Sequence, residues 1–190
     1  MKTLKNKTYY YRLNRCFKFN SAHFIAFDNF RETLHGHNYK IGFELSCDNI
    51  SNKYNNLVNE DIIDKELTFI SKYLKHKILI AENCKYIKII YLDNNKDILH
   101  ETINYEKENK YYYVKVIALC DNKEFIFPAS DVLVLKDINQ ISVECLCKYV
   151  CDVLYENKDN YLYNDVKYNY LSIKIYEDIG KAGVYKKLLN

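Results

Sequence analysis

The sequence has 190 residues, 48% of them hydrophobic and 28% charged, with a net charge of +3. This length and apolar content predict one domain, residues 1–190, with a real core and exclude a disordered chain. Basic and acidic residues are interleaved, so the basic stripe that nucleic-acid binding needs is missing. No apolar run approaches the roughly 20 residues of a membrane helix, and no secretory signal opens the sequence. We therefore expect a soluble, cytoplasmic protein, and its seven scattered cysteines are expected to be reduced thiols.

Two extended segments are predicted first. One runs from about Tyr10 to Phe24, and the second runs from His35 to Cys47. In the second segment every other residue from His35 to Leu45 shares one face, and all of these residues beyond the histidines are apolar. The two segments predict an antiparallel hairpin with a long connection.

Two amphipathic helices are predicted further along. The first begins after Asn59, a good N-cap residue, and has a helical apolar stripe: Ile63, Leu67, Ile70 and Leu74. The second begins after Ser142 with another stripe: Leu146, Val150, Val153 and Leu154. Short β-like runs lie between the helices, separated by the turn clusters "DNNKD", "EKEN" (106–109) and "DNKE", and a last strand at 168–178 is predicted to end the chain. This order of elements indicates an α+β fold.

Three histidines fall where the two predicted strands would bring them together. His35 and His37 point the same way because residues i and i+2 share a strand face, and His23 lies at the end of the preceding strand. Three neutral imidazoles that leave a fourth position open are typical of catalytic zinc. A His-X-His pair alone is weak evidence. His23, nearby Glu32 and the lack of other catalytic motifs favour a metal site.

The last predicted strand carries a carboxylate in an unusual place. Alternation puts Glu177 on the same face as three apolar residues, Leu171, Ile173 and Ile175. A buried carboxylate is costly unless it accepts hydrogen bonds. Exposure at the strand end or an ion pair with lysine would explain it. The functional alternative is an anchor for a ligand with paired N–H donors, such as the edge of a pterin or guanine ring.

These residues together resemble the 6-pyruvoyl-tetrahydropterin synthase and 6-carboxytetrahydropterin synthase family. The matching segments are "FNSAHF", "LHGHNYKIGFEL", "ISVECLCKYV", and "IKIYED" followed by "GVYKK". The resemblance is poor over about residues 85–128, which we interpret as a β-rich insertion. It implies the tunnelling fold, with an antiparallel four-stranded sheet and two helices on one face. It also implies a homo-oligomer, a trimer or a hexamer, with active sites between subunits.

The resemblance implies roles for particular residues. Zinc would be held by three of them: His23, His35 and His37. Glu177 would bind the pterin ring, and Glu144, in the segment similar to the start of the family's second helix, would also contact the substrate. His76 takes the place of the family's proton-relay histidine, but Lys75 stands where the family has aspartate. A surface histidine whose charge suits the helix end is the alternative for His76.

The family's catalytic cysteine is missing between His23 and His35, and Glu32 occupies that neighbourhood. The pattern Glu-X-X-His-Gly-His resembles the type III branch of the family. This implies a zinc-dependent lyase that cleaves the side chain of 7,8-dihydroneopterin triphosphate to 6-hydroxymethyl-7,8-dihydropterin in folate biosynthesis, with Glu32 as base. Two alternatives stay open: triphosphate elimination to 6-pyruvoyl-tetrahydropterin, of the tetrahydrobiopterin pathway, and an inactive homologue that binds zinc and pterin.

Overall fold

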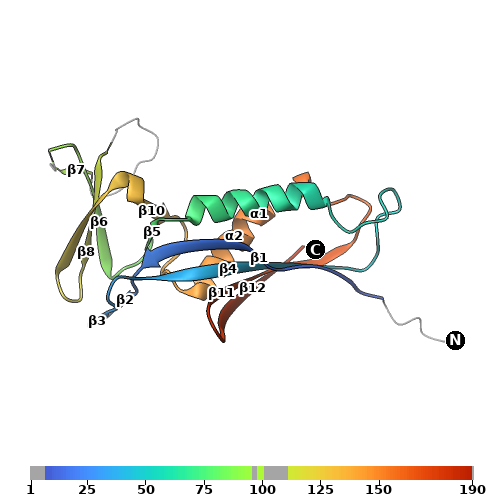
Figure 1. Cartoon of the computed structure of the whole chain (residues 1–190), viewed down its shortest axis with the longest axis horizontal. Helices are drawn as coiled ribbons and strands as arrows, with labels where there is room; N and C mark the ends of the chain where they lie inside the picture. Colours follow the sequence, from blue (N-terminus) through green and yellow to red (C-terminus); the bar gives the residue numbers. More distant parts are fainter. Residues whose placement is uncertain (1–6, 96–97, 101–110, 190) are drawn as a thin grey trace. The chain divides into compact units, whose positions relative to one another are not determined.

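The computed structural model of the chain describes residues 7–95, 98–100 and 111–189. Its fold is α+β, as predicted (Figure 1). Contacts group the chain into two compact units, each built from separate segments. The first comprises Met1–Phe19, Asn38–Tyr73 and Leu146–Asn190, and the second comprises Asn20–His37 and Leu74–Cys145. The turn expected at 106–109 lies outside the described residues.

The first unit contains the antiparallel part of a six-stranded sheet, in the order β1-β4-β11-β12. Its strands are β1 (Tyr9–His23), β4 (His35–Cys47), β11 (Tyr168–Asp178) and β12 (Lys181–Leu188). Strand β11 runs antiparallel to both β4 and β12. Ring contacts of Tyr11 with Phe43 and of Phe19 with Tyr39 show that β1 and β4 also run in opposite directions. The predicted hairpin and the four antiparallel strands are therefore confirmed. The expected strand number is corrected, because two short strands, β5 (Ile78–Ala81) and β10 (Val132–Leu135), continue the same sheet beyond β1 and give six strands in the order β10-β5-β1-β4-β11-β12.

Strand β12 corrects the expectation that the chain ends with the strand at 168–178. The chain turns at Gly180, whose φ of 83° suits glycine, and returns as β12. This strand lacks an alternating apolar pattern because it is an edge strand, and only Gly183 in it is buried. Its lysines are typical of a sheet edge that must not pair with another chain.

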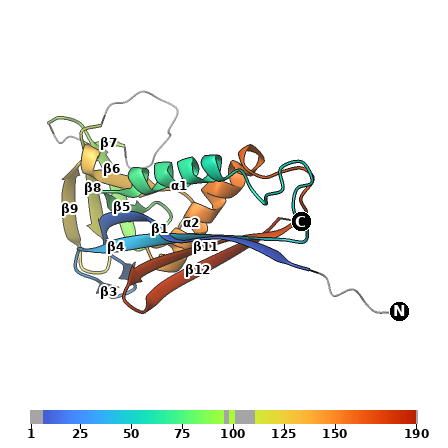
Figure 2. The same cartoon turned by 45° about the vertical axis from the view of Figure 1, so that its right-hand side comes forward.

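The two helices, α1 (Glu60–Leu74) and α2 (Val143–Glu156), lie on one face of this sheet (Figure 2). Helix α1 begins where predicted, with the Asn59 side chain accepting the Ile62 N–H at 3.4 Å. Its whole predicted stripe is buried. In α2 the stripe was partly wrong, because Val153 is only half-buried while Cys147 and Cys151 pack in the core. Cysteine acts there as a small apolar residue.

A carboxylate on α2 links the helix to strand β12. Asp152 accepts hydrogen bonds from Lys148 at 2.7 Å and from Lys187 at 2.6 Å. Burial alone would raise the pKa of the Asp152 carboxyl, but the two lysines outweigh it and hold the pKa below its usual range. A depressed carboxyl pKa contributes stability at neutral pH that is lost as the pH falls through the folded-state value.

We predict that Asp152→Asn lowers the free energy of unfolding by about 1 kcal/mol at pH 7, the usual value of a lost hydrogen bond. The difference should shrink as the pH falls below about 4, where the carboxyl of the unfolded chain is protonated. Urea unfolding between pH 7 and pH 3 measures this. Asp159→Asn is the matched control, because the Asp159 side chain is 90% exposed. Equal destabilisation at both ends of the pH range would contradict the prediction.

The second unit contains the end of β1 and most of the strands between the helices. Ala22 of β1 pairs with Ile78 of β5 (Ile78–Ala81), and β5 pairs with β10 (Val132–Leu135), both in parallel. These parallel pairs were not predicted, because a four-residue apolar run has no readable period and its pairing partner is distant in sequence.

A separate antiparallel sheet in the second unit has the order β7-β6-β8-β9. Its strands are β7 (Ile98–His100), β6 (Ile87–Leu92), β8 (Tyr113–Ala118) and β9 (Lys123–Pro128). The β-like runs predicted in this region are thus strands. A hairpin is formed by β2 (Ala26–Phe27) and β3 (Phe30–Arg31), and short 3-10 helices occupy Ala129–Asp131 and Lys158–Asn160.

Two chain-wide features complete the fold. Within residues 7–95, 98–100 and 111–189, no helix has the length and apolarity to cross a membrane. None of the six cysteines with described side chains forms a disulfide, and the side chain of Cys16 lies outside the description.

Candidate metal centre

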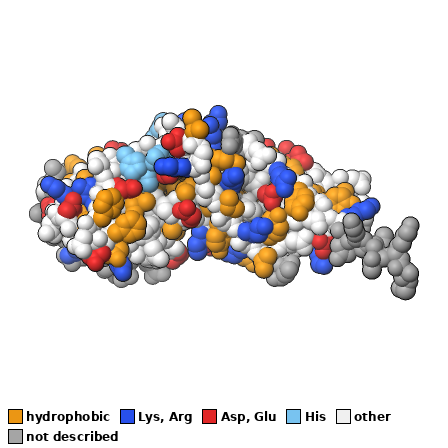
Figure 3. Space-filling view, turned by 90° about the horizontal axis from the view of Figure 1, so that it is seen from below, with side chains coloured by type: hydrophobic (Ala, Val, Ile, Leu, Met, Phe, Trp, Pro, Cys, Tyr) orange, Lys and Arg blue, Asp and Glu red, His pale blue; other side chains and the backbone are white. Residues whose placement is uncertain are grey.

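Three histidines of the second unit converge on one point. His23 is the last residue of β1, and His35 and His37 lie at the start of β4. Their ring nitrogens that could bind a metal lie within 4.8 Å of one another. The ring centroids are 4.6, 5.4 and 4.8 Å apart. The structure therefore brings together the three residues that strand alternation had predicted to meet, and Figure 3 shows histidine side chains gathered at the surface.

His23 and His35 have surroundings that suit neutral metal ligands. The pKa of the buried His23 side chain is lowered to about 4, first by burial and then by the neighbouring His35 and His37. This side chain is uncharged at neutral pH. His35 donates its Nδ1–H to the Thr33 carbonyl at 2.8 Å, which leaves Nε2 available. Such a hydrogen bond on the far nitrogen is usual for a metal-binding histidine. The donor set fits zinc with an open coordination position.

Gly36 lets strand β4 approach β1 between the two ligands. A Cβ on Gly36 would lie 3.1 Å from the Ser21 carbonyl oxygen, closer than ordinary packing allows. At Gly42, further along the same strand, the nearest atom to an added Cβ would be 3.5 Å away. A methyl group at the first position would push against the backbone of β1, whereas the second position has room for one.

We predict that Gly36→Ala weakens zinc binding about tenfold, the low end of the effects seen when the support of a metal ligand is disturbed. The added methyl would displace the backbone of β4 at the residue between His35 and His37, and so would move both side chains. Competition with a fluorescent chelator measures the affinity. Gly42→Ala, the control on the same strand, should bind zinc like the wild type. Equal affinity of both variants would show that the close approach does not set the ligand positions.

Glu32 directly follows β3 and is fixed through its backbone. Its N–H donates to the Ile25 carbonyl at 2.9 Å, and its own carbonyl accepts from Arg31 Nη1 at 2.7 Å. Its Oε2 is buried and has no hydrogen-bond partner within the described part of the chain. A buried carboxylate oxygen without a donor is costly. This cost is typical of a group kept for function.

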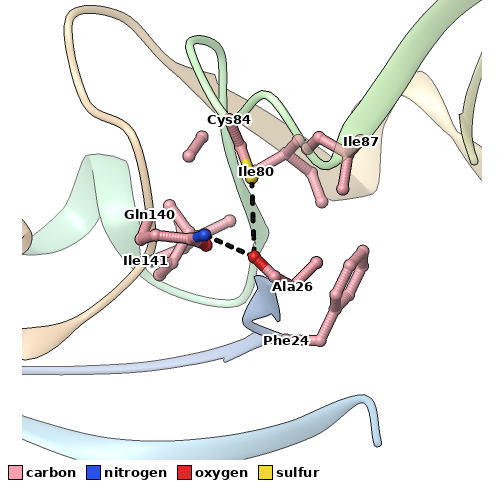
Figure 4. Close-up of a pocket in the computed structure, with 9 residues that line it drawn as sticks. Phe24, Ala26, Ile80, Cys84, Ile87, Gln140 and Ile141 are labelled. Carbon is pink, nitrogen blue, oxygen red and sulfur yellow. Dashed lines mark hydrogen bonds between the residues drawn. The ribbon is translucent and has the colours of Figure 1, made fainter. Parts of the chain in front are cut away.

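A small pocket adjoins the hairpin that leads to Glu32, with Ala26 among its lining residues. Figure 4 shows Gln140 and Cys84 pointing at the Ala26 carbonyl, to which both donate hydrogen bonds. Burial raises the pKa of the Cys84 thiol, so it is an unreactive, protonated side chain. The two hydrogen bonds hold strand β2 at Ala26. Ala26 pairs with Arg31 of β3, the residue directly before Glu32.

The other predicted site residues, His76, Glu144 and Glu177, are not members of the three-histidine cluster. The exposed His76 follows α1 with a φ of 59°, and its N–H donates to the Asn20 carbonyl at 2.7 Å, three residues before His23. Glu144 is exposed in the first turn of α2. Glu177 belongs to the first unit, is half-buried, and occupies an irregularity in the pairing of β11 with β12. Such bulges often re-aim a side chain near an active site.

Sequence reasoning missed three residues around Glu32: Arg31, Asp121 and Gln140. Arg31 Nε donates to Asp121 Oδ2 at 3.0 Å, across 90 positions of sequence. Gln140 reaches Ala26 over a separation of 114. No local pattern marks partners that far apart, so only the fold reveals them.

The α+β fold and the three converging histidines define a protein of the tunnelling-fold class with a candidate metal centre. A family model for 6-pyruvoyl tetrahydropterin synthase matches residues 12–187, and the chain belongs to this family. It is accordingly a lyase-type pterin enzyme.

Solved structures agree on the fold. The 6-pyruvoyl tetrahydropterin synthase of Plasmodium falciparum is 23% identical, with a TM-score of 0.75 over 97% of this chain and 100% of that one. A Plasmodium vivax synthase, in which a glutamate described as catalytic is replaced by alanine, has the same identity and TM-score over 96% and 99%. An uncharacterised Wolinella succinogenes protein is 12% identical, with a TM-score of 0.53 over 94% and 98%. No curated protein matches the chain.

Proposed function

We propose that this chain cleaves the side chain of 7,8-dihydroneopterin triphosphate to 6-hydroxymethyl-7,8-dihydropterin, for folate synthesis, with zinc as cofactor. The observation that carries this proposal is Glu32, whose buried Oε2 has no hydrogen-bond partner among the described residues. It lies three residues before His35, in the neighbourhood where usual family members have a cysteine base. The Plasmodium vivax relative, whose catalytic residue is a glutamate, supports the same assignment.

The chain's own residues would divide the work. Zinc held by the three histidines would act as a Lewis acid on the vicinal hydroxyls of the substrate side chain and lower their pKa. Glu32 would accept the proton of the second hydroxyl. The carbon–carbon bond between the two hydroxyl-bearing carbons would then break, leaving a triphosphate-bearing aldehyde, while the ring's conjugated imine takes up the electron pair. The ring-side carbon would then accept the proton back from Glu32, which restores the imine and gives the hydroxymethyl group. Glu177 would orient the ring by accepting its paired N–H donors.

A second candidate is triphosphate elimination to 6-pyruvoyl-tetrahydropterin, and the family match favours it. In that reaction Glu32 would remove a carbon-bound proton instead of a hydroxyl proton. The two routes differ in where the carboxylate lies relative to the substrate, and small differences in such geometry decide reaction rates. For either route, we propose a cytoplasmic trimer or hexamer, with Glu144 as a further substrate contact.

Product analysis tests the proposal. Zinc-loaded protein is incubated with dihydroneopterin triphosphate, and the products are resolved by mass. We expect 6-hydroxymethyl-7,8-dihydropterin as the main product. A 6-pyruvoyl product alone would support the second candidate. Pterin binding without turnover in zinc-loaded protein would show an inactive homologue and overturn both reactions.

A further inference from the structure

Arg31 joins the backbone of Glu32 to a distant hairpin. Its side chain is only 15% exposed. Nη1 donates to the Glu32 carbonyl at 2.7 Å, and Nε donates to Asp121 Oδ2 at 3.0 Å. The guanidinium carbon also lies 5.2 Å from the ring centroid of Phe125 and 6.0 Å from that of Phe24, and these two rings stack on each other.

We propose that Arg31 and Asp121 position the catalytic carboxylate of Glu32, so that the β8–β9 hairpin within the 85–128 insertion supports the active site. We call this pair the Arg31–Asp121 clamp. The proposal rests on the proposed role of Glu32 as base. Neither residue touches the reacting atoms in this scheme, and both are positioning residues.

The Glu32 end of the clamp is short and needs outside support. The β2–β3 hairpin has two residues in each strand, too few to be rigid alone. Glu32 is held at both backbone polar groups, because its N–H bonds to Ile25 and its carbonyl bonds to Arg31. With the backbone held, only side-chain rotation remains to place the carboxylate.

The Asp121 end of the clamp is built on a regular sheet. Asp121 lies in the turn between β8 and β9, which pair along their full length from Tyr113 with Pro128 to Ala118 with Lys123. Its Oδ1 accepts the Lys123 N–H at 3.2 Å, so the turn orients the carboxylate and leaves Oδ2 for Arg31. The next residue, Asn122, has a φ of 54°, as expected in a tight turn.

The guanidinium group suits a link between these two ends. Its donors form a rigid, planar and permanently charged fork, so one group can bond an acid and a carbonyl in fixed directions. The stacked rings of Phe24 and Phe125 support its flat face. Phe24 directly follows His23, so the same packing adjoins a candidate metal ligand.

A double-mutant cycle tests the clamp through turnover. We expect Arg31→Gln and Asp121→Ala each to lower kcat about 30-fold, within the range for a misplaced catalytic group, while KM stays within about twofold. In the Glu32→Gln background the same changes should lower the residual kcat less than about threefold, because the group they position is already gone. Zinc content should equal that of the wild type.

A matched control removes another ion pair of the same hairpin. Lys115→Met breaks the 2.8 Å contact of Lys115 with Glu124, between β8 and β9. This variant should keep wild-type kcat. The positioning role is wrong if Arg31→Gln and Asp121→Ala lower kcat by the same factor in the wild-type and Glu32→Gln backgrounds. It is also wrong if they leave kcat unchanged in both backgrounds.

Hydrogen exchange tests the clamp without activity. We expect the Glu32 amide, bonded to Ile25, to exchange at least about tenfold faster in Arg31→Gln and Asp121→Ala. Amides of β8 should keep their wild-type rates. If wild-type protein shows no turnover, the proposed function fails while the exchange rates still decide on the clamp. Unchanged exchange at Glu32 would overturn it whatever the activity.

Discussion

Glu32→Gln is expected to lower kcat for dihydroneopterin triphosphate about 10³-fold, within the usual range for removing a general base. Glutamine keeps the shape of the side chain but cannot accept a proton at neutral pH. The backbone bonds of Glu32 to Ile25 and Arg31 do not involve the carboxylate, so the fold around it should persist. Steady-state kinetics on zinc-loaded protein measure the loss.

The control is Glu156→Gln, which makes the same chemical change at an exposed position near the end of α2. It should keep wild-type kcat. The glutamine at position 32 should also leave zinc content and thermal stability unchanged, or raise stability slightly, because the substitution removes the charge of a partly buried carboxylate. Turnover at the wild-type rate would show that another group is the base.

His37→Ala is expected to weaken zinc binding at least about 100-fold. Mutating a residue that only hydrogen-bonds to a metal ligand lowers metal affinity 10- to 100-fold. The present change removes one of the three candidate ligands itself. Turnover should fall with the metal. Elemental analysis after dialysis, together with chelator competition, measures the loss. Buried His23 would be a poorer choice, because its removal would leave a cavity that also destabilises the fold.

The comparison for this variant is His76→Ala, an exposed histidine outside the three-histidine cluster. It should bind zinc like the wild type. Its kcat separates the two interpretations of His76, because a proton relay predicts a loss and a surface histidine near the helix end predicts none. Full zinc binding by His37→Ala would mean that the converging rings do not form the metal site.

Local patterns were enough to predict the elements that carry the candidate metal centre. Strand β4 was predicted with its observed bounds, since alternate residues from Tyr39 to Leu45 are apolar and its two histidines continue the same face. Helix α1 was equally clear, with a cap, an acidic first turn and a fully buried stripe. Each signal lies within about a dozen neighbouring residues, which is the range over which strand and helix periods can be read.

Elements without such a pattern were missed or misjudged. Strands β5 and β10 are four-residue apolar runs joined in parallel across more than 50 positions. Strand β12 is exposed on most of its length and so has little apolar signal. In α2 the sequence alone could not rank Val153 against Cys147 and Cys151, because the width of the buried stripe depends on what packs against the helix.

The sequence by itself determined the α+β class, the likeness to the pterin synthase family and the three histidines that converge, because these depend on local periodicity and short motifs. Only the tertiary structure decided how Glu32 is held. The bonds of Arg31 to Asp121 and of Gln140 to Ala26 join residues about 90 to 114 positions apart. Contacts between distant segments depend on chain topology, which no local pattern encodes, and here they hold the backbone of the hairpin that leads to Glu32.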